Sequence, residues 1–140
     1  MEPVRTGLGE RHMAPQKSGD RPAVGAEAIV IAHALGPTGK PIRKRWNGGG
    51  RAALYRVPRV AKPRHPCEKP LALMEALVRD FTEPGELVAD PFCGSGSTLV
   101  AAVKCGRRAI GWERNEGWAR LARRRLRVAR EQFDLFEVSA

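Results

Sequence analysis

The chain has 140 residues, a length at which one domain can bury a modest core. Its 25 Lys and Arg outnumber 15 Asp and Glu, and a net charge of +10 is typical of proteins that bind nucleic acid or another polyanion. No stretch approaches the roughly 18 apolar residues that a membrane-spanning helix needs, which excludes a spanning role. The first residues also lack the apolar run of a signal peptide.

The cysteines indicate a reducing compartment. Cys67, Cys93 and Cys105 are an odd number, with no Cys-x-x-Cys pair and no histidine at zinc-finger spacing. We therefore expect free thiols, a cytoplasmic protein and no metal site.

The excess positive charge lies in the first half of the chain. Residues 1–64 contain 13 Lys and Arg against 4 Asp and Glu, whereas residues 65–140 contain 12 against 11. The first part is also interrupted by many prolines and glycines, while the second has a regular apolar pattern. This division predicts a first part that faces a polyanion and a second part that holds the core.

The first part has few signs of regular structure. Residues 1–25 are polar and broken by proline and glycine, so we expect a loop or disordered lead-in. Residues 27–33 are a short β-branched apolar run, which predicts a buried strand. The remainder, to residue 64, is expected to be irregular and basic. Its segment 40–51 combines cations, one aromatic residue and three glycines, as a DNA-binding loop would, although a merely solvated loop is an open alternative.

The second part, residues 65–140, alternates helices and strands. Apolar spacing and Gly or Pro breaks predict helix 69–81, strand 87–89, helix 97–104 ended by Gly106, strand 108–113 and helix 115–130. On the last helix Trp118, Ala122, Leu126 and Ala129 share a face. The arginines of this helix are expected on its solvated side, with phosphate contact as the secondary interpretation: Arg123, Arg124, Arg125, Arg127 and Arg130. This order is typical of an α/β fold with a parallel sheet flanked by helices.

The loop after strand 87–89 carries the most informative chemistry. Gly94 and Gly96 would let a ligand approach the backbone, and Ser97 can cap the following helix. A dinucleotide fingerprint needs a third glycine where Leu99 stands. Asp90 would repel a pyrophosphate but suits a ligand with an ammonium group.

A second carboxylate ends the next strand. Glu113 can accept hydrogen bonds from the two hydroxyls of a ribose. An amino acid joined to a nucleoside without phosphates satisfies both carboxylates, and S-adenosylmethionine is such a molecule. An ordinary turn at the glycines and a solvated Glu113 are the open alternatives.

Two motifs then resemble a known family. Asp90-Pro91-Phe92-Cys93-Gly94-Ser95-Gly96-Ser97-Thr98 resembles the cofactor motif Asp-Pro-Phe-x-Gly-x-Gly-Thr-Thr of N6-adenine/N4-cytosine DNA methyltransferases. His65-Pro66-Cys67-Glu68-Lys69-Pro70 resembles the segment that precedes it in the β-class members, and Trp46-Asn47-Gly48-Gly49-Gly50 is similar to a segment of prophage-type members. The resemblance covers about residues 20–130. It implies a partial Rossmann-like, S-adenosylmethionine-dependent methyltransferase fold in a bacterial or phage-encoded enzyme of DNA methylation and restriction-modification.

The resemblance also implies roles for individual residues. Asp90 would bind the methionine amino group, Glu113 the ribose, and Trp112 or its neighbours would lie beside the adenine. The whole expected cofactor site consists of Lys69, Pro70, Asp90, Pro91, Phe92, Cys93, Gly94, Gly96, Ser97, Thr98 and Glu113. Contacts to double-stranded DNA are expected from Lys40, Arg43, Lys44, Arg45, Trp46, Asn47 and Arg51. Within the site His65 would set the loop geometry, and Cys93 is not expected to be a nucleophile because Phe92 separates it from Pro91.

One part of the family pattern is missing. Members grip the flipped base with an Asp/Asn/Ser-Pro-Pro-Tyr/Phe/Trp motif, and this sequence has no Pro-Pro dipeptide. We therefore expect a truncated or split enzyme, with a complementary subunit that supplies the motif and covers an incomplete parallel sheet. The alternative from another class is a non-catalytic DNA-binding protein that retains the scaffold, and a weaker one is an enzyme acting on RNA or protein.

Overall fold

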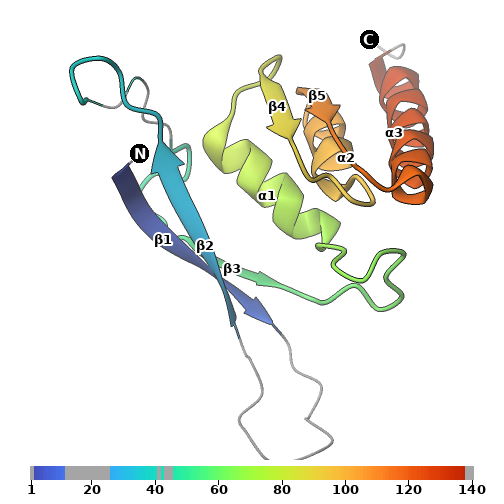
Figure 1. Cartoon of the computed structure of the whole chain (residues 1–140), viewed down its shortest axis with the longest axis horizontal. Helices are drawn as coiled ribbons and strands as arrows, with labels where there is room; N and C mark the ends of the chain where they lie inside the picture. Colours follow the sequence, from blue (N-terminus) through green and yellow to red (C-terminus); the bar gives the residue numbers. More distant parts are fainter. Residues whose placement is uncertain (1, 12–25, 41, 43–45, 138–140) are drawn as a thin grey trace, which may run out of the picture. The chain divides into compact units, whose positions relative to one another are not determined.

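The computed structural model describes residues 2–11, 26–40, 42 and 46–137, and it divides the chain into two compact units, residues 1–59 and 60–140 (Figure 1). The sequence placed the boundary five residues later, at 65. Residues 60–64 belong to the second unit, where the Arg64 N–H donates to Glu68 Oε2 at 2.6 Å.

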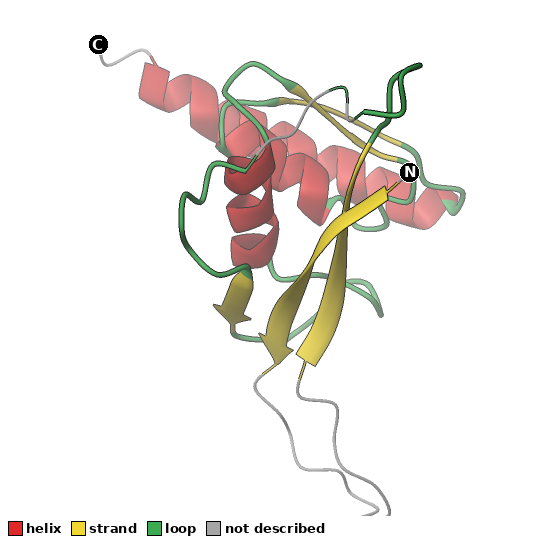
Figure 2. Ribbon diagram, turned by 90° about the vertical axis from the view of Figure 1, so that its left-hand side faces the viewer, coloured by secondary structure: helices red, strands yellow, loops and turns green. Residues whose placement is uncertain are grey.

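The first unit is built on a three-stranded sheet in the order β2-β1-β3 (Figure 2). Strand β1 (Glu2–Arg11) is central, pairing antiparallel with β2 (Ala26–His33) and parallel with β3 (Leu54–Val57). The strand expected over residues 27–33 is therefore present, within a sheet that the sequence did not predict.

Strand β1 corrects the expected loop over residues 1–25. Pro3, Gly7 and Gly9 are residue types that strands disfavour, and they concealed the strand in the sequence. The segment is extended nevertheless, because a neighbour on each side completes its backbone hydrogen bonds. The register shifts between Pro3 and Arg5, which places a bulge beside the proline. The rest of the expected lead-in, residues 12–25, lies outside the described residues.

Strand β2 is an edge strand, so the expectation of a buried strand was wrong. From Glu27 to His33 its residues alternate between half-buried and exposed, and the side chain of Val30 is 71% exposed. A continuous apolar run is typical of a strand covered on both faces, but β2 is covered on one.

The second unit is a parallel βαβ arrangement, as the sequence predicted. Strands β4 (Leu87–Asp90) and β5 (Arg108–Gly111) pair in parallel, and the connecting helix α2 (Ser97–Lys104) packs against them. Helices α1 (Leu71–Phe81) and α3 (Glu116–Glu137) both pack on α2. The buried core residues of this layer are Val78, Val100, Ala101, Ala102, Val103 and Ala129.

The helix ends follow local chemistry, with two differences from the sequence prediction. Gly106 terminates α2 with a φ of +73°, as expected. At the other end of α2, the N-cap residue is Gly96, in the left-handed region, and no side chain caps the helix. The predicted capping role of Ser97 was therefore wrong. Helix α3 continues seven residues past the predicted end at 130, because residues 131–137 contain neither Gly nor Pro.

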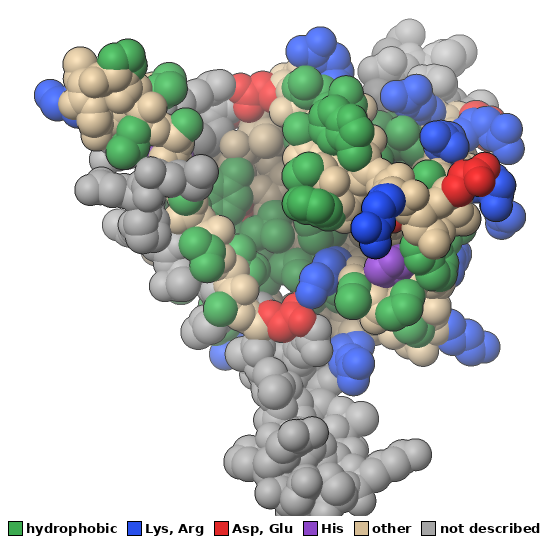
Figure 3. Space-filling model, in the orientation of Figure 1, with side chains coloured by type: hydrophobic (Ala, Val, Ile, Leu, Met, Phe, Trp, Pro, Cys, Tyr) green, Lys and Arg blue, Asp and Glu red, His purple; other side chains and the backbone are tan. Residues whose placement is uncertain are grey.

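The outer face of the β4–β5 sheet is uncovered in the part of the chain that the structure describes. Leu87 is 53% exposed, Ile110 43% and Trp112, just beyond β5, 54%. Figure 3 shows hydrophobic side chains gathered over this region. Among the described residues no helix is both long and apolar enough to cross a membrane.

We expect Ala102→Leu to lower the free energy of unfolding by about 1–3 kcal/mol, because Ala102 is fully buried between α2 and its neighbours and three added carbons overpack the site. Urea unfolding followed by circular dichroism measures the change. Ala72→Leu, on the exposed side of α1, is the matched control and should stay within about 0.5 kcal/mol. Equal midpoints for the two variants would contradict this packing.

Candidate cofactor site

The structure brings the two sequence motifs together. A Cβ added at Gly94 would lie 3.5 Å from His65 Cε1, so the imidazole lies directly against the glycine loop. His65 Nδ1 accepts a hydrogen bond from the Cys67 N–H at 3.1 Å, and its ring meets Trp118 edge to face with centroids 4.7 Å apart. The imidazole therefore shapes its own turn and joins it to the loop and to α3, in line with the expected structural role.

A buried ion pair holds the same two segments together. Arg125 Nη1 lies 2.9 Å from Glu68 Oε1, and only 13% and 6% of these side chains are exposed. The same nitrogen donates to the carbonyl oxygen of Ser95 at 2.8 Å and to Ser95 Oγ at 2.9 Å. Helix α3 is thus fixed to the glycine loop and to the His65 segment through one guanidinium.

The expectation that Arg125 lies on the solvated side of the last helix was wrong. Arg125 follows Trp118 by seven residues and Ala122 by three, and it precedes Ala129 by four, so it belongs to their buried face. That spacing was visible in the sequence, but the run of arginines concealed it. Burial lowers the pKa of Arg125 and Glu68 opposes this shift, and a guanidinium remains charged at any pH at which the protein is folded.

Both predicted carboxylates stand at the ends of neighbouring parallel strands. Asp90 Oδ1 accepts the Phe92 N–H at 3.0 Å. Glu113 Oε2 accepts the Gly94 N–H at 3.1 Å, and its Oε1 accepts the Asn115 N–H at 2.7 Å. Each carboxylate thereby fixes a turn, and Glu113 also ties the loop after β4 to the loop after β5. Since a carboxylate oxygen has two lone pairs, Glu113 keeps acceptor capacity for a ligand.

The charges of Asp90 and Glu113 act on the thiol of the glycine loop. The pKa of the Cys93 thiol is raised, first by burial and then by the charges of Asp90 and Glu113. The same charges would oppose a phosphate and favour a ligand with cationic groups, so the residues fit an amino acid joined to a nucleoside better than a dinucleotide. Burial and these charges together reduce the thiolate fraction of Cys93 at any given pH.

The loop depends on its two predicted glycines. Gly94 and Gly96 have φ values of +51° and +81°, which other residues rarely adopt. A Cβ at Gly96 would lie 2.9 Å from Ala122 Cβ, so the glycine also permits the close approach of α3.

The remaining predicted cofactor residues differ in exposure. Ser97 is buried, with its Oγ 3.4 Å from Arg125 Nη1, and Thr98 is half-buried in the first turn of α2. Pro70 is half-buried at the start of α1, while Lys69 and Pro91 are exposed. Phe92 is 88% exposed, so its ring points away from the second unit's core and is open to a ligand or a partner.

The basic segment of the first unit is described at Lys40, Trp46, Asn47 and Arg51, while Arg43, Lys44 and Arg45 lie outside the described residues. Trp46 Nε1 donates to the Gly49 carbonyl oxygen at 2.7 Å, and the Arg51 guanidinium lies 5.5 Å from its ring centroid. A Cβ at Gly48 would lie 2.3 Å from the Trp46 ring, so the indole folds over its own glycine turn. Lys40 and Asn47 are exposed.

A glycine loop between parallel strands, with one carboxylate at each strand end, is typical of α/β domains that bind a nucleotide or nucleoside. The chain belongs to the N6/N4 DNA methylase family: the family model, described as "DNA methylase", matches residues 12–124. Among curated relatives, the type II methyltransferase M2.DpnII of Streptococcus pneumoniae is 34% identical over 93 residues, which are 66% of this chain and 33% of that protein. The DNA adenine methyltransferase YhdJ of Escherichia coli K12 is 42% identical over 65 residues, 46% of this chain and 22% of that protein.

Solved structures give the same class. The M1.HpyAVI–SAM complex superposes with a TM-score of 0.71 at 26% identity, over 89% of this chain and 62% of that one. The chain therefore spans a third or less of the two curated relatives and about three fifths of this structure. The match confirms the partial methyltransferase fold that the two motifs predicted.

We expect Glu68→Gln to lower the free energy of unfolding by about 3–5 kcal/mol, because it leaves the buried Arg125 charge uncompensated. Chemical denaturation measures the loss. Glu131→Gln is the matched control: its partner Arg127 is 3.9 Å away and both side chains are mostly exposed, so the change should stay below about 1 kcal/mol. Similar losses in both variants would show that burial of the Glu68 pair does not matter.

Iodoacetamide should modify the exposed Cys67 well before Cys93 at pH 7–8. A raised pKa reduces the thiolate fraction of Cys93 at any given pH, and its rate should rise only as pH approaches the raised value. Peptide mass spectrometry after timed quenching follows each thiol. In urea the difference should disappear, and faster labelling of Cys93 in the folded protein would refute the raised pKa of its thiol.

Proposed function

We propose that this chain is the cofactor-binding part of a DNA methyltransferase that modifies the exocyclic amine of adenine or cytosine with S-adenosylmethionine. The observation that carries the proposal is the glycine loop with the charges of Asp90 and Glu113 beside it, held against the His65 segment by the Glu68–Arg125 pair. The similarity to M1.HpyAVI, solved in complex with SAM, supports the same cofactor.

Different residues would bind the ammonium group, the ribose, the methionine chain and the adenine of the cofactor. Asp90 accepts the ammonium through the oxygen that does not bind the Phe92 N–H, and Glu113 accepts the ribose hydroxyls through its remaining lone pairs. The backbone at Gly94 and Gly96 borders the methionine, with Lys69 and Pro70 closing the opposite side. Phe92, which is mostly exposed, borders the methionine, and Trp112, which is about half exposed, lies beside the adenine.

The chemistry supplied by S-adenosylmethionine is an electrophilic methyl group on a sulfonium. The part of the protein in hand contributes orientation and a field that suits a cation, and such positioning provides much of the acceleration in a direct transfer to an amine. These residues do not hold the flipped-out base, because the sequence has no Pro-Pro motif. Cationic and aromatic residues of segment 40–51 would hold the duplex.

A complementary polypeptide segment that carries the Pro-Pro motif would complete the enzyme. The apolar outer face of β4 and β5, with Leu87 and Ile110 exposed, is the surface that such a segment would cover. We infer that methyl transfer requires this segment, whether it belongs to the same polypeptide or to a second subunit.

Calorimetric titration of the purified chain with S-adenosylmethionine tests the cofactor site. Asp90→Asn and Glu113→Gln should each weaken binding about tenfold or more, since each removes a charge-assisted hydrogen bond. Glu116→Gln, an exposed carboxylate paired with Arg120, is the control and should bind normally. Bound cofactor should also slow alkylation of Cys93 and leave Cys67 unchanged.

A labelled-methyl assay on duplex DNA completes the test. The chain alone should give no product, and a complement with the Pro-Pro motif should restore transfer. If Asp90→Asn and Glu113→Gln both bind the cofactor as the wild type does, and the chain still binds DNA, the result would instead favour a DNA-binding protein that keeps the scaffold.

A further inference from the structure

A concave surface lies along α3 in the second unit. It is a groove of about 360 Å³ between α2, α3 and the segment that leads into α1. Its floor is apolar and its rim is cationic. It is lined by Arg64, Leu71, Val100, Lys104, Leu121, Arg124, Arg125, Val128, Ala129 and Gln132.

Two of the four cations in the groove are compensated. Lys104 Nζ lies 3.2 Å from Glu75 Oε1, and Arg125 is held by Glu68. Among the residues whose side chains the structure describes, which in α3 end at Gln132, none forms an ion pair with Arg64 or Arg124, and the lining contains no carboxylate. The groove thus presents two exposed guanidinium groups, from different elements, above an apolar surface.

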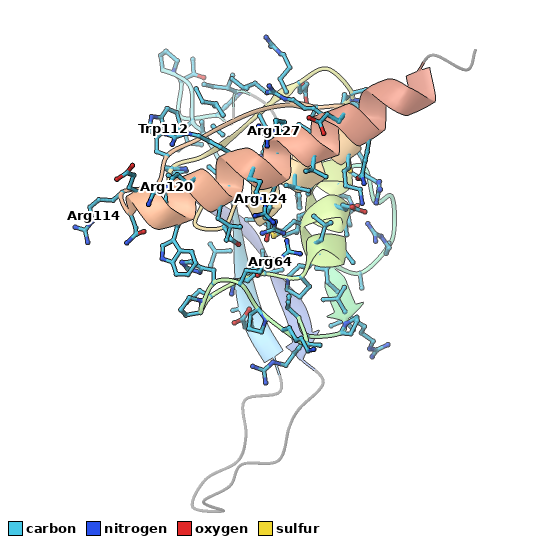
Figure 4. All side chains as sticks on the ribbon, turned by 90° about the vertical axis from the view of Figure 1, so that its right-hand side faces the viewer. Arg64, Trp112, Arg114, Arg120, Arg124 and Arg127 are labelled. Atoms are coloured by element: carbon cyan, nitrogen blue, oxygen red, sulfur yellow. The ribbon has the colours of Figure 1, made fainter. Side chains whose placement is uncertain are left out.

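The positive charge continues along the helix beyond the groove. Figure 4 shows Arg120, Arg124 and Arg127 in a row along α3, with Arg64 beside the row. Arg120 is bound to Glu116 at 2.8 Å and Arg127 to Glu131 at 3.9 Å, but all four side chains are mostly exposed. Exposed pairs contribute little free energy, so an external anion can replace the glutamates.

The phosphodiester backbone of DNA matches this surface. It alternates anionic phosphates with apolar sugars, as the groove sets guanidinium groups beside Leu121 and Val128. A guanidinium donates to phosphate oxygens in a bidentate fork. At a rise of 1.5 Å per residue, Arg120 to Arg127 spans roughly 10 Å, about the axial distance covered by four successive phosphates of one strand.

An acidic, amphipathic protein segment is the competing occupant of such a groove. The arginines Arg120, Arg124 and Arg127 favour DNA, because they extend along α3 past the apolar floor of the groove. A protein segment anchored in the groove would find no apolar contact there, whereas a DNA backbone needs none. We propose that the α2–α3 groove and the row Arg120, Arg124 and Arg127 bind the sugar–phosphate backbone of duplex DNA, separately from segment 40–51. The inference rests on the proposed function, since it adds a second contact to the same substrate.

Fluorescence anisotropy of the full chain with a mixed-sequence 20-base-pair duplex, over a series of salt concentrations, tests the groove. Arg64→Gln/Arg124→Gln should weaken binding about tenfold and reduce the slope of log K against log salt by about 1.8, because two phosphate contacts are lost. Arg123→Gln/Arg130→Gln removes the same charge from the side of α3 turned away from the groove, and it should change the affinity less than about threefold. Thermal unfolding and cofactor titration should be unchanged in both double variants, because all four side chains are exposed.

Other results overturn the inference. Equal effects in the two double variants would show that only net charge matters, and a wild-type chain that does not bind the duplex would remove the basis for the site. Loss of binding to poly-glutamate in Arg64→Gln/Arg124→Gln, with unchanged DNA affinity, would assign the groove to an acidic protein. The proposed function fails separately, if Asp90→Asn and Glu113→Gln bind S-adenosylmethionine as the wild type does.

Discussion

The site depends on one buried charge pair between Glu68 and Arg125. Glu68 belongs to the segment before α1, Arg125 to α3, and the guanidinium also binds Ser95 in the glycine loop. Three segments far apart in the chain therefore converge on a single, largely buried nitrogen. A buried ion pair contributes less net stability than its geometry suggests, but it specifies one arrangement strongly because every alternative leaves a buried charge alone.

Small residues allow the elements of the second unit to approach closely. Ala101 and Ala102 lie fully buried in α2, and Gly96 leaves room for the Cβ of Ala122 from α3. The carboxylates of Asp90 and Glu113 follow β4 and β5 at the same end of the sheet because the two strands are parallel. Their charges raise the pKa of the Cys93 thiol, in addition to the larger effect of burial.

The sequence predicted the second unit much better than the first. Strands β4 and β5 and helices α1 and α2 follow from local apolar spacing, and the two motifs predicted which loops meet. Strand β1 was missed because its pairing partners are distant and its own residues, such as Gly7 and Gly9, disfavour a strand. Arg125 was misplaced because residue type was given more weight than helical position. The exposure of Phe92 could not be predicted either, since it depends on which strands and helices surround the loop.

The bonds of Glu113 have a consequence for how a ligand would arrive. Its two oxygens accept the N–H groups of Gly94 and Asn115, so bonds within the chain fix the loops after β4 and β5. A ligand that binds there does not have to supply the free energy of fixing those backbones, which is about 1–2 kcal/mol for each residue ordered. Preorganisation of this kind leaves the affinity to be set by the ligand's own contacts.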